Sequence, residues 1–300
     1  MRTMQKNRMF IFGPARSGTT LISNLLSQHV NLHILVDSML YQKTKRAYEM
    51  LARKCSLDPK KPDVNVPLSY QQTKYIVSMV MFWLLDIQYD LPLRDGVYGS
   101  WLKTYRERVD PYPILQKAKT KPLTIRNLLD ELWLQMAGEL SEEITCYGEK
   151  TPSNTHCARW VLAAYPNAKT IMVVRNPYTN IASIYNRSIP QYDLPHAVHT
   201  YLKFYKTLLK IKDLPNVKVI HYEDIINNLV ETGNEMFSFL GLSQHILEPI
   251  FEPVARVDYV GSEITKDKDN KLKQVFNAEQ KKYIREHCGH IFDTFYPAEI

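Results

Sequence analysis

One short segment constrains the fold of this chain more than any other, because three different patterns follow one another in it directly. Residues 9–26 are MFIFGPARSGTTLISNLL. The first four are wholly apolar, which is typical of a strand buried on both faces of a parallel sheet. From Thr19 onward the apolar residues recur at helical spacing. The segment therefore predicts a buried strand, a loop bounded by two glycines and a helix.

Other apolar runs continue this pattern along the chain. Thr170–Val174 and Val217–His221 predict two more buried strands, and Leu32–Val36 is a possible fourth. Strands that alternate with helical patterns indicate a parallel sheet covered on both faces, so we expect an α/β fold of three layers, α/β/α. No linker rich in Gly, Pro or Ser divides the chain, and a single domain over residues 1–300 is expected. The predicted helices cover residues 69–87, 124–140, 154–164, 178–186, 197–212, 226–240 and 278–287.

The loop between the first strand and the first helix has the composition of an anion site. Gly13 and Gly18 stand in the pattern G-x-x-x-x-G. Glycines let backbone N–H groups turn toward a ligand, and the helix N-terminus adds partial positive charge. A nucleoside triphosphatase would have lysine after the second glycine, where this chain has Thr19. The loop therefore predicts a phosphate-type ligand and argues against chemistry at a magnesium-bound γ-phosphate. Its side-chain donors are Arg16, Ser17, Thr19 and Thr20.

A second candidate anion site follows the strand at residues 170–174. Arg175 stands at the carboxyl end of this strand, where α/β sheets bind ligands. Ser183 and Arg187 are four residues apart and share one face of the helix predicted there. The alternative interpretation is an arginine that ends a strand beside an exposed helical serine.

Together these segments resemble sulfotransferases that use 3′-phosphoadenosine 5′-phosphosulfate (PAPS). Residues 14–21, PARSGTTL, are similar to the 5′-phosphosulfate loop, in the arginine-containing form of the tyrosylprotein branch and its bacterial relatives. Arg175 with Ser183 resembles the 3′-phosphate motif, and Arg187 matches a further arginine of some members. The resemblance implies a P-loop-like fold and PAPS as the co-substrate. It covers residues 9–30, 146–187 and 217–242.

The same resemblance suggests residues for the chemistry. Transfer of a sulfuryl group needs cations where charge grows on the leaving oxygen, and a base for the acceptor proton. We assign the first role to Arg16 and Lys150, since residues 148–152, GEKTP, are similar to a family element. The resemblance implies a glutamate as the base, eight residues after the histidine that ends the first helix; counted from His29, this position holds Asp37, a shorter carboxylate. An N-cap role for Asp37 is the alternative, and Glu149 and His33 are further candidates for the base.

Tyr222 lies in residues 219–225, VIHYEDI, which resemble another element of the family. Its ring could pack on the adenine of the donor. A tyrosine at a sheet edge with no ligand is the alternative. The acceptor that the resemblance implies is a hydroxyl group, of a sugar, lipid, phenol or peptidyl tyrosine.

Composition limits which classes of partner, metal site and cellular location are expected for this chain. The net charge of +7 is spread along the chain without a basic stripe interleaved with aromatics, so we expect no nucleic-acid partner. The four cysteines form no CxxC pair and the nine histidines form no HxH pattern, so no metal is expected. No apolar run reaches the roughly 20 residues of a membrane span, and a cytoplasmic protein is expected. The alternatives are a P-loop small-molecule kinase and a non-catalytic nucleotide- or glycan-binding protein; the oligomeric state stays open.

Overall fold

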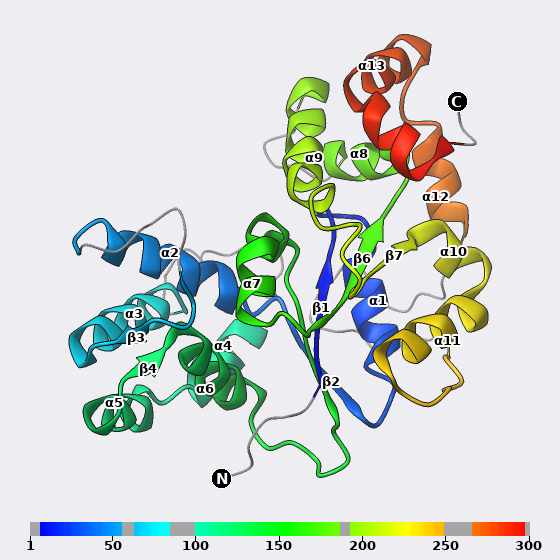
Figure 1. Ribbon diagram of the computed structural model, residues 1–300. Coiled ribbons are helices and arrows are strands. Elements are labelled where there is room, and N and C mark those ends of the chain that lie inside the picture. Colours follow the sequence, from blue (N-terminus) through cyan, green and yellow to red (C-terminus); the bar gives the residue numbers. More distant parts are fainter. Residues whose placement is uncertain (1–6, 56–62, 85–99, 187–192, 249–265, 298–300) are drawn as a thin grey trace.

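The centre of the computed structural model, which describes residues 7–55, 63–84, 100–186, 193–248 and 266–297, is a five-stranded sheet (Figure 1). Every neighbouring pair of strands is parallel. The carboxyl ends of all five strands therefore lie along one edge. In spatial order the strands are β2 (Leu32–Val36), β5 (Cys146–Lys150), β1 (Asn7–Phe12), β6 (Lys169–Val174) and β7 (Val217–His221).

The sheet is covered on both faces because β1, its central strand, is apolar on both. Met9 and Ile11 face one core, while Phe10 and Phe12 face the other, and all four are fully buried. This alternation is the two-residue period of a strand. The three-layer α/β/α architecture expected from the sequence is confirmed. The face of Met9 packs against α1 (Thr19–Leu26), α10 (Tyr222–Asn227) and α11 (Leu229–Leu240). The opposite face packs against α2 (Leu40–Ala52), α7 (Ala158–Ala164), α8 (Pro177–Tyr185), α9 (Leu194–Leu208) and α13 (Ala278–Phe295).

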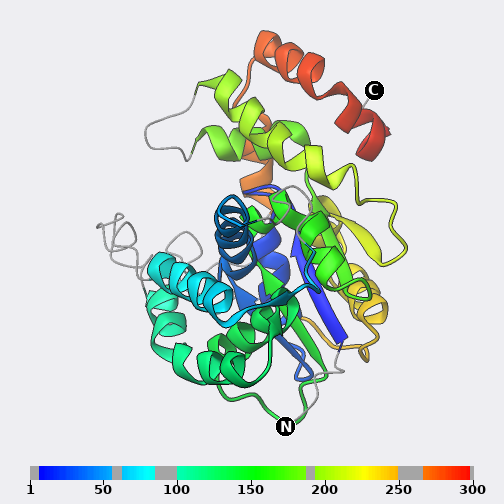
Figure 2. The same cartoon turned by 60° about the vertical axis from the view of Figure 1, so that its left-hand side comes forward.

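A group of helices extends this second layer beyond α2. Figures 1 and 2 show them gathered on the opposite side of the molecule from α13. A short antiparallel pair, β3 and β4, joins them, and their apolar side chains belong to the same core as the sheet. These elements are β3 (Pro67–Leu68), α3 (Tyr70–Leu84), α4 (Ser100–Arg108), α5 (Pro111–Thr120), β4 (Leu123–Thr124) and α6 (Ile125–Ala137).

The structure corrects the sequence analysis in several helices and in one strand. No helix was predicted between residues 30 and 68 or between residues 88 and 123, yet α2 lies in the first range and α4 and α5 lie in the second. The helix predicted over 154–164 is divided into a 3₁₀ helix, η2 (Pro152–Cys157), and α7. Strand β5 was missed altogether. Its sequence, CYGEK, has a glycine and two charged residues instead of an apolar run, although all five residues are buried.

Candidate functional site

The glycine loop between β1 and α1 depends on backbone conformations that few residues adopt. Gly18 has a φ of 96°, in the left-handed region where glycine has no steric penalty. A Cβ at this position would also lie 2.4 Å from Cδ2 of Tyr222. The loop closes on itself, since the backbone N–H and the hydroxyl of Ser17 both donate to the carbonyl of Pro14. Ser17, predicted to donate to a ligand, thus directs its hydroxyl proton into the loop itself.

Lys150 contacts two other residues predicted for the site. Its Nζ donates to Oγ1 of Thr20, at 2.9 Å, and to Oδ1 of Asp37, at 3.0 Å. The sheet order explains this meeting: β5 lies between β2 and β1, so its last residue lies between Asp37, which follows β2, and the loop, which follows β1. The Lys150 side chain is fully buried, and a buried ammonium group needs such partners.

Asp37 does not cap helix α2. The N-cap of α2 is Met39, and its side chain makes no capping hydrogen bond. The N-cap alternative is therefore wrong, and the Asp37 carboxylate contacts Lys150 instead. In the described part of the chain the non-glycine residues with positive φ are Arg16, Asp37 and Met39. All three follow strand ends at one edge of the sheet. Unfavourable backbone conformations of this kind concentrate at functional sites.

Glu149, one of the other candidates for the base, is held in hydrogen bonds that stabilise this edge of the sheet. It lies on the opposite face of β5 from Lys150 and is 1% exposed. Its carboxylate accepts from Oγ of Ser38 (2.7 Å), Nδ2 of Asn154 (2.6 Å) and the hydroxyl of Thr151. The oxygens of the same three side chains accept from the backbone N–H groups of Leu40, Gln42 and Met39, at the start of α2. Glu149 therefore holds the segment that follows Asp37.

His33 lies away from this edge. It stands three residues before the end of β2 and its ring packs edge-on against Trp133, with centroids 5.9 Å apart. Burial, together with the charge of Arg108, lowers the pKa of His33. Among the three candidates for the base, Asp37 is the one in contact with Lys150.

Replacement of Glu149 by glutamine is expected to change how stability depends on pH. Burial raises the pKa of Glu149 to about 7 in the folded protein. At pH values between the pKa of Glu149 in the unfolded chain and pH 7, the Glu149 carboxyl is therefore protonated in the folded state and ionised in the unfolded state. The free energy of unfolding of the natural chain should fall by about 3 kcal/mol relative to Glu149→Gln as the pH rises from 4 to 8. Urea unfolding of both proteins across this range measures it, and parallel pH profiles would contradict it.

The second predicted anion site lies directly against the loop. Nη1 of Arg175 donates to the carbonyl of Arg16 at 2.8 Å, and Nε of Arg16 donates to Oγ of Ser183 at 3.2 Å. Asn180 adds a further link, since its Nδ2 donates to the carbonyl of Ala15 at 2.8 Å. The two sites predicted from separate motifs thus form one continuous surface. Arg187 lies outside the described residues.

The guanidinium of Arg175 has three neighbours. Besides the Arg16 carbonyl, it contacts Oδ1 of Asp269 at 2.6 Å through Nη2, and it lies 4.3 Å from the ring centroid of Tyr222. Its Nε is buried and, among the residues that the structure describes, has no hydrogen-bond partner. Asp269 belongs to α12 (Lys266–Lys273), and the sequence analysis missed it. Nothing local signals this role, because α12 is a short run of alternating charges typical of a solvated surface.

Two features are absent from the residues that the structure describes, a metal-binding cluster and a membrane-spanning helix. No group of three or more His, Cys, Asp and Glu side chains in those residues is arranged to hold a metal ion. Within the same residues, no helix has both the length and the apolar character that crossing a bilayer requires.

A sequence-family model described as "Sulfotransferase family" matches residues 8–245 of this chain. The chain belongs to the sulfotransferase family. The match contains the loop, Lys150, Arg175 and Tyr222, and it ends before Asp269. No curated protein sequence matches this sulfotransferase.

Solved structures of sulfotransferases share its fold. The sulfotransferase domain from the Synechococcus PCC 7002 olefin synthase has a TM-score of 0.52 at 15% identity, over 95% of this chain and 96% of that domain. The sulfotransferase domain from the curacin biosynthetic pathway gives 0.49 at 16% identity, over 96% and 99%. Mouse sulfotransferase SULT7A1 complexed with PAP (3′-phosphoadenosine 5′-phosphate) has a TM-score of 0.42 at 12% identity, over 96% of this chain and 85% of that protein. The first of these confirms the P-loop-like fold with a central parallel sheet.

Proposed function

We propose that this sulfotransferase moves a sulfuryl group from PAPS to the hydroxyl of an acceptor. The observation that carries the proposal is the contact of one buried lysine, Lys150, with both Thr20 of the anion loop and the Asp37 carboxylate. A cation between an anion-binding loop and a carboxylate is what in-line transfer from an anionic donor to a hydroxyl requires. The acceptor is a sugar, lipid, phenol or peptidyl tyrosine.

The residues present fit a donor with two anionic ends. Arg16, Gly18, Thr19 and Thr20 bind the phosphosulfate end, where the loop and the N-terminus of α1 supply N–H donors. Arg175, Ser183 and Arg187 bind the 3′-phosphate, and the unpartnered buried Nε of Arg175 is a donor suited to such an anion. The ring of Tyr222 packs against adenine. Ser17 keeps the loop closed. The co-substrate supplies the sulfuryl group.

The residues at the reacting end divide two tasks between them. Lys150 and Arg16 stabilise the negative charge that grows on the leaving phosphate oxygen. Asp37 accepts the proton of the acceptor hydroxyl. Support for Asp37 comes from its contact with Lys150 and from the positions of the other two candidates, since Glu149 is held in three buried hydrogen bonds and His33 packs on Trp133.

Turnover should be independent of divalent metal. The position after Gly18 holds Thr19 instead of the lysine that serves a magnesium-bound γ-phosphate, so the site is built for a donor that needs no magnesium. We expect release of PAP from PAPS, with a panel of hydroxylated acceptors, to proceed at the same rate in EDTA and in magnesium. Strict dependence on magnesium, with ATP as the donor, would favour the kinase. Tight PAP binding without turnover on any acceptor would favour the non-catalytic binding protein.

A further inference from the structure

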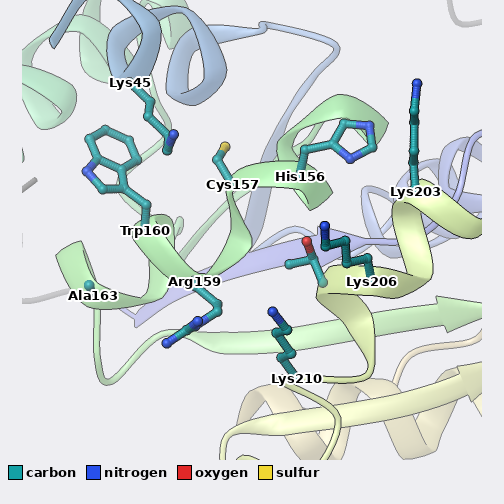
Figure 3. Close-up of a pocket in the computed structure, with 10 residues that line it drawn as sticks. Lys45, His156, Cys157, Arg159, Trp160, Ala163, Lys203, Lys206 and Lys210 are labelled. Atoms are coloured by element: carbon teal, nitrogen blue, oxygen red, sulfur yellow. The ribbon is translucent and has the colours of Figure 1, made fainter. Parts of the chain in front are cut away.

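A groove in the described structure lies away from the proposed donor site. It has a volume of about 810 Å³ and opens between α2, η2, α7 and α9 (Figure 3). It lies on the helical layer of the sheet's second face, and none of the residues assigned to the donor site lines it. The volume falls within the range of about 300–1,000 Å³ that is typical of small-molecule sites.

Five basic side chains from three helical segments line this groove. Lys203 and Lys206 come from α9 and Lys210 from the turn that follows it. These three are spaced at i, i+3 and i+7, so they lie on one face. Arg159 projects from α7 and Lys45 from α2, so that the cations surround the groove from several sides (Figure 3). No carboxylate is among its lining residues.

Most of this positive charge has no counterion among the residues that the structure describes. Lys45 pairs with Glu49, one turn along α2. Arg159, Lys203, Lys206 and Lys210 are exposed, and none of them forms an ion pair with another residue in the described ranges. Like charges on one helix face repel one another and lower stability. A cluster of this kind in a concave surface is stabilised when an anion neutralises it.

The lining also contains aromatic side chains, but they are not arranged to stack successive bases. The ring of His156 is already stacked on Phe204, with centroids 4.4 Å apart, and Trp160 is 6% exposed. Single-stranded nucleic acids are bound by a cationic groove together with exposed aromatic platforms. The groove therefore matches a compact anion better than a nucleic-acid strand.

We propose that this groove is a second anion site, which binds a small oligoanion with three or more phosphate or sulfate groups. Four cations that form no ion pair with any described residue are best neutralised by several negative charges in one ligand. The volume limits the enclosed part of this ligand to about the size of a nucleotide or a disaccharide. Arginine and lysine bind phosphate and sulfate groups through charge-assisted hydrogen bonds. The ligand is an inorganic or organic oligophosphate, or a sulfated sugar.

The test is calorimetry with tripolyphosphate and with a trisulfated disaccharide, in the presence of saturating PAP. PAP occupies the proposed donor site, so that the probes cannot bind there. If PAP does not bind, the same titrations are made with the Arg16→Ala/Arg175→Ala variant, in which the donor site has lost its arginines. A failure of the proposed function can then be distinguished from a failure of the second anion site. We expect one oligoanion per chain. The probe that binds more tightly identifies the source, phosphate ester or sulfated sugar.

The decisive comparison is between two charge-reversal variants. Lys206→Glu/Lys210→Glu should weaken oligoanion binding by about tenfold or more, because it reverses two of the groove's charges. Lys121→Glu/Lys282→Glu makes the same change in net charge at two exposed positions outside the groove and should leave binding unchanged. Equal weakening by both variants, no binding of either probe, or equally tight binding of citrate would overturn the proposal. Circular dichroism of both variants establishes that they fold.

Discussion

Replacing Lys150 by methionine is expected to lower kcat for sulfuryl transfer by about 10²–10³-fold, which is typical for the loss of one donor that stabilises transition-state charge. Methionine keeps a long side chain in a fully buried position but removes the ammonium group that contacts Thr20 and Asp37. PAP release in single-turnover experiments measures the rate. Lys169→Met is the matched control. Like Lys150, Lys169 lies on a strand of the sheet, and its ammonium group donates to the backbone carbonyl of Phe239. It is the first residue of β6, however, and so lies at the edge of the sheet opposite the proposed site.

The loss of Lys150 also affects stability, and this effect has to be separated from catalysis. Removing one partner of a buried ion pair costs about 3–5 kcal/mol, because the other charge stays buried and uncompensated. Here that charge is Asp37, whose side chain is 5% exposed. Lys150→Met/Asp37→Asn should regain most of the stability while its activity stays low. A folded Lys150→Met protein with near-natural turnover would contradict the role of Lys150.

Arg175→Ala is expected to weaken PAP binding by about 10–100-fold and to leave AMP binding nearly unchanged. A hydrogen bond to a charged group contributes about 1.5–3 kcal/mol. AMP has no 3′-phosphate, so its binding does not include this hydrogen bond and cannot be weakened by its loss. Calorimetry with both nucleotides gives the difference directly. Equal losses for PAP and AMP would mean that Arg175 supports the Arg16 carbonyl and the loop instead of binding the 3′-phosphate.

Asp269 provides the matched variant for this experiment. Its carboxylate contacts Nη2 of Arg175, so a 3′-phosphate at Arg175 competes with it and is repelled by its charge. Asp269→Asn should therefore strengthen PAP binding, in the opposite direction from Arg175→Ala. If Asp269→Asn instead weakens PAP as much as Arg175→Ala does, Asp269 orients the arginine for its ligand. The side chains of Arg175 and Asp269 are 6% and 3% exposed, so either substitution can also lower stability. Thermal unfolding of both variants therefore has to be measured beside PAP binding.

Sequence reasoning was most accurate where a local pattern carries its own structure. The apolar run before Gly13 forms the central strand, and Val217–His221 and Leu32–Val36 form strands with the predicted bounds. Gly241, with a φ of 75°, ends α11 in the left-handed conformation that glycine adopts without steric penalty. These features depend on the side-chain periods of helices and strands and on the conformational freedom of glycine, all of which are visible in a few adjacent residues.

It was least accurate where neighbours come from distant parts of the chain. Strand β5 lies inside the sheet, between β2 and β1, although its residues do not form an apolar run, because Glu149 has three buried hydrogen-bond partners and Lys150 is paired. Ser38 and Asp37 follow β2, Asn154 lies in η2, and Thr151 stands between β5 and η2. No spacing within the segment could show that its charges would be satisfied, so the strand was missed.

The sequence by itself determined that a buried strand, a glycine loop without a P-loop lysine and a helix follow one another, and that arginine and lysine stand at further strand ends. Only the tertiary structure decided which of these ends are neighbours. The order β2–β5–β1 placed Lys150 between Asp37 and Thr20 and left His33 on Trp133. The physical reason is that helix and strand patterns are set by residues a few positions apart, whereas a buried charge is stabilised only by partners that the fold brings to it.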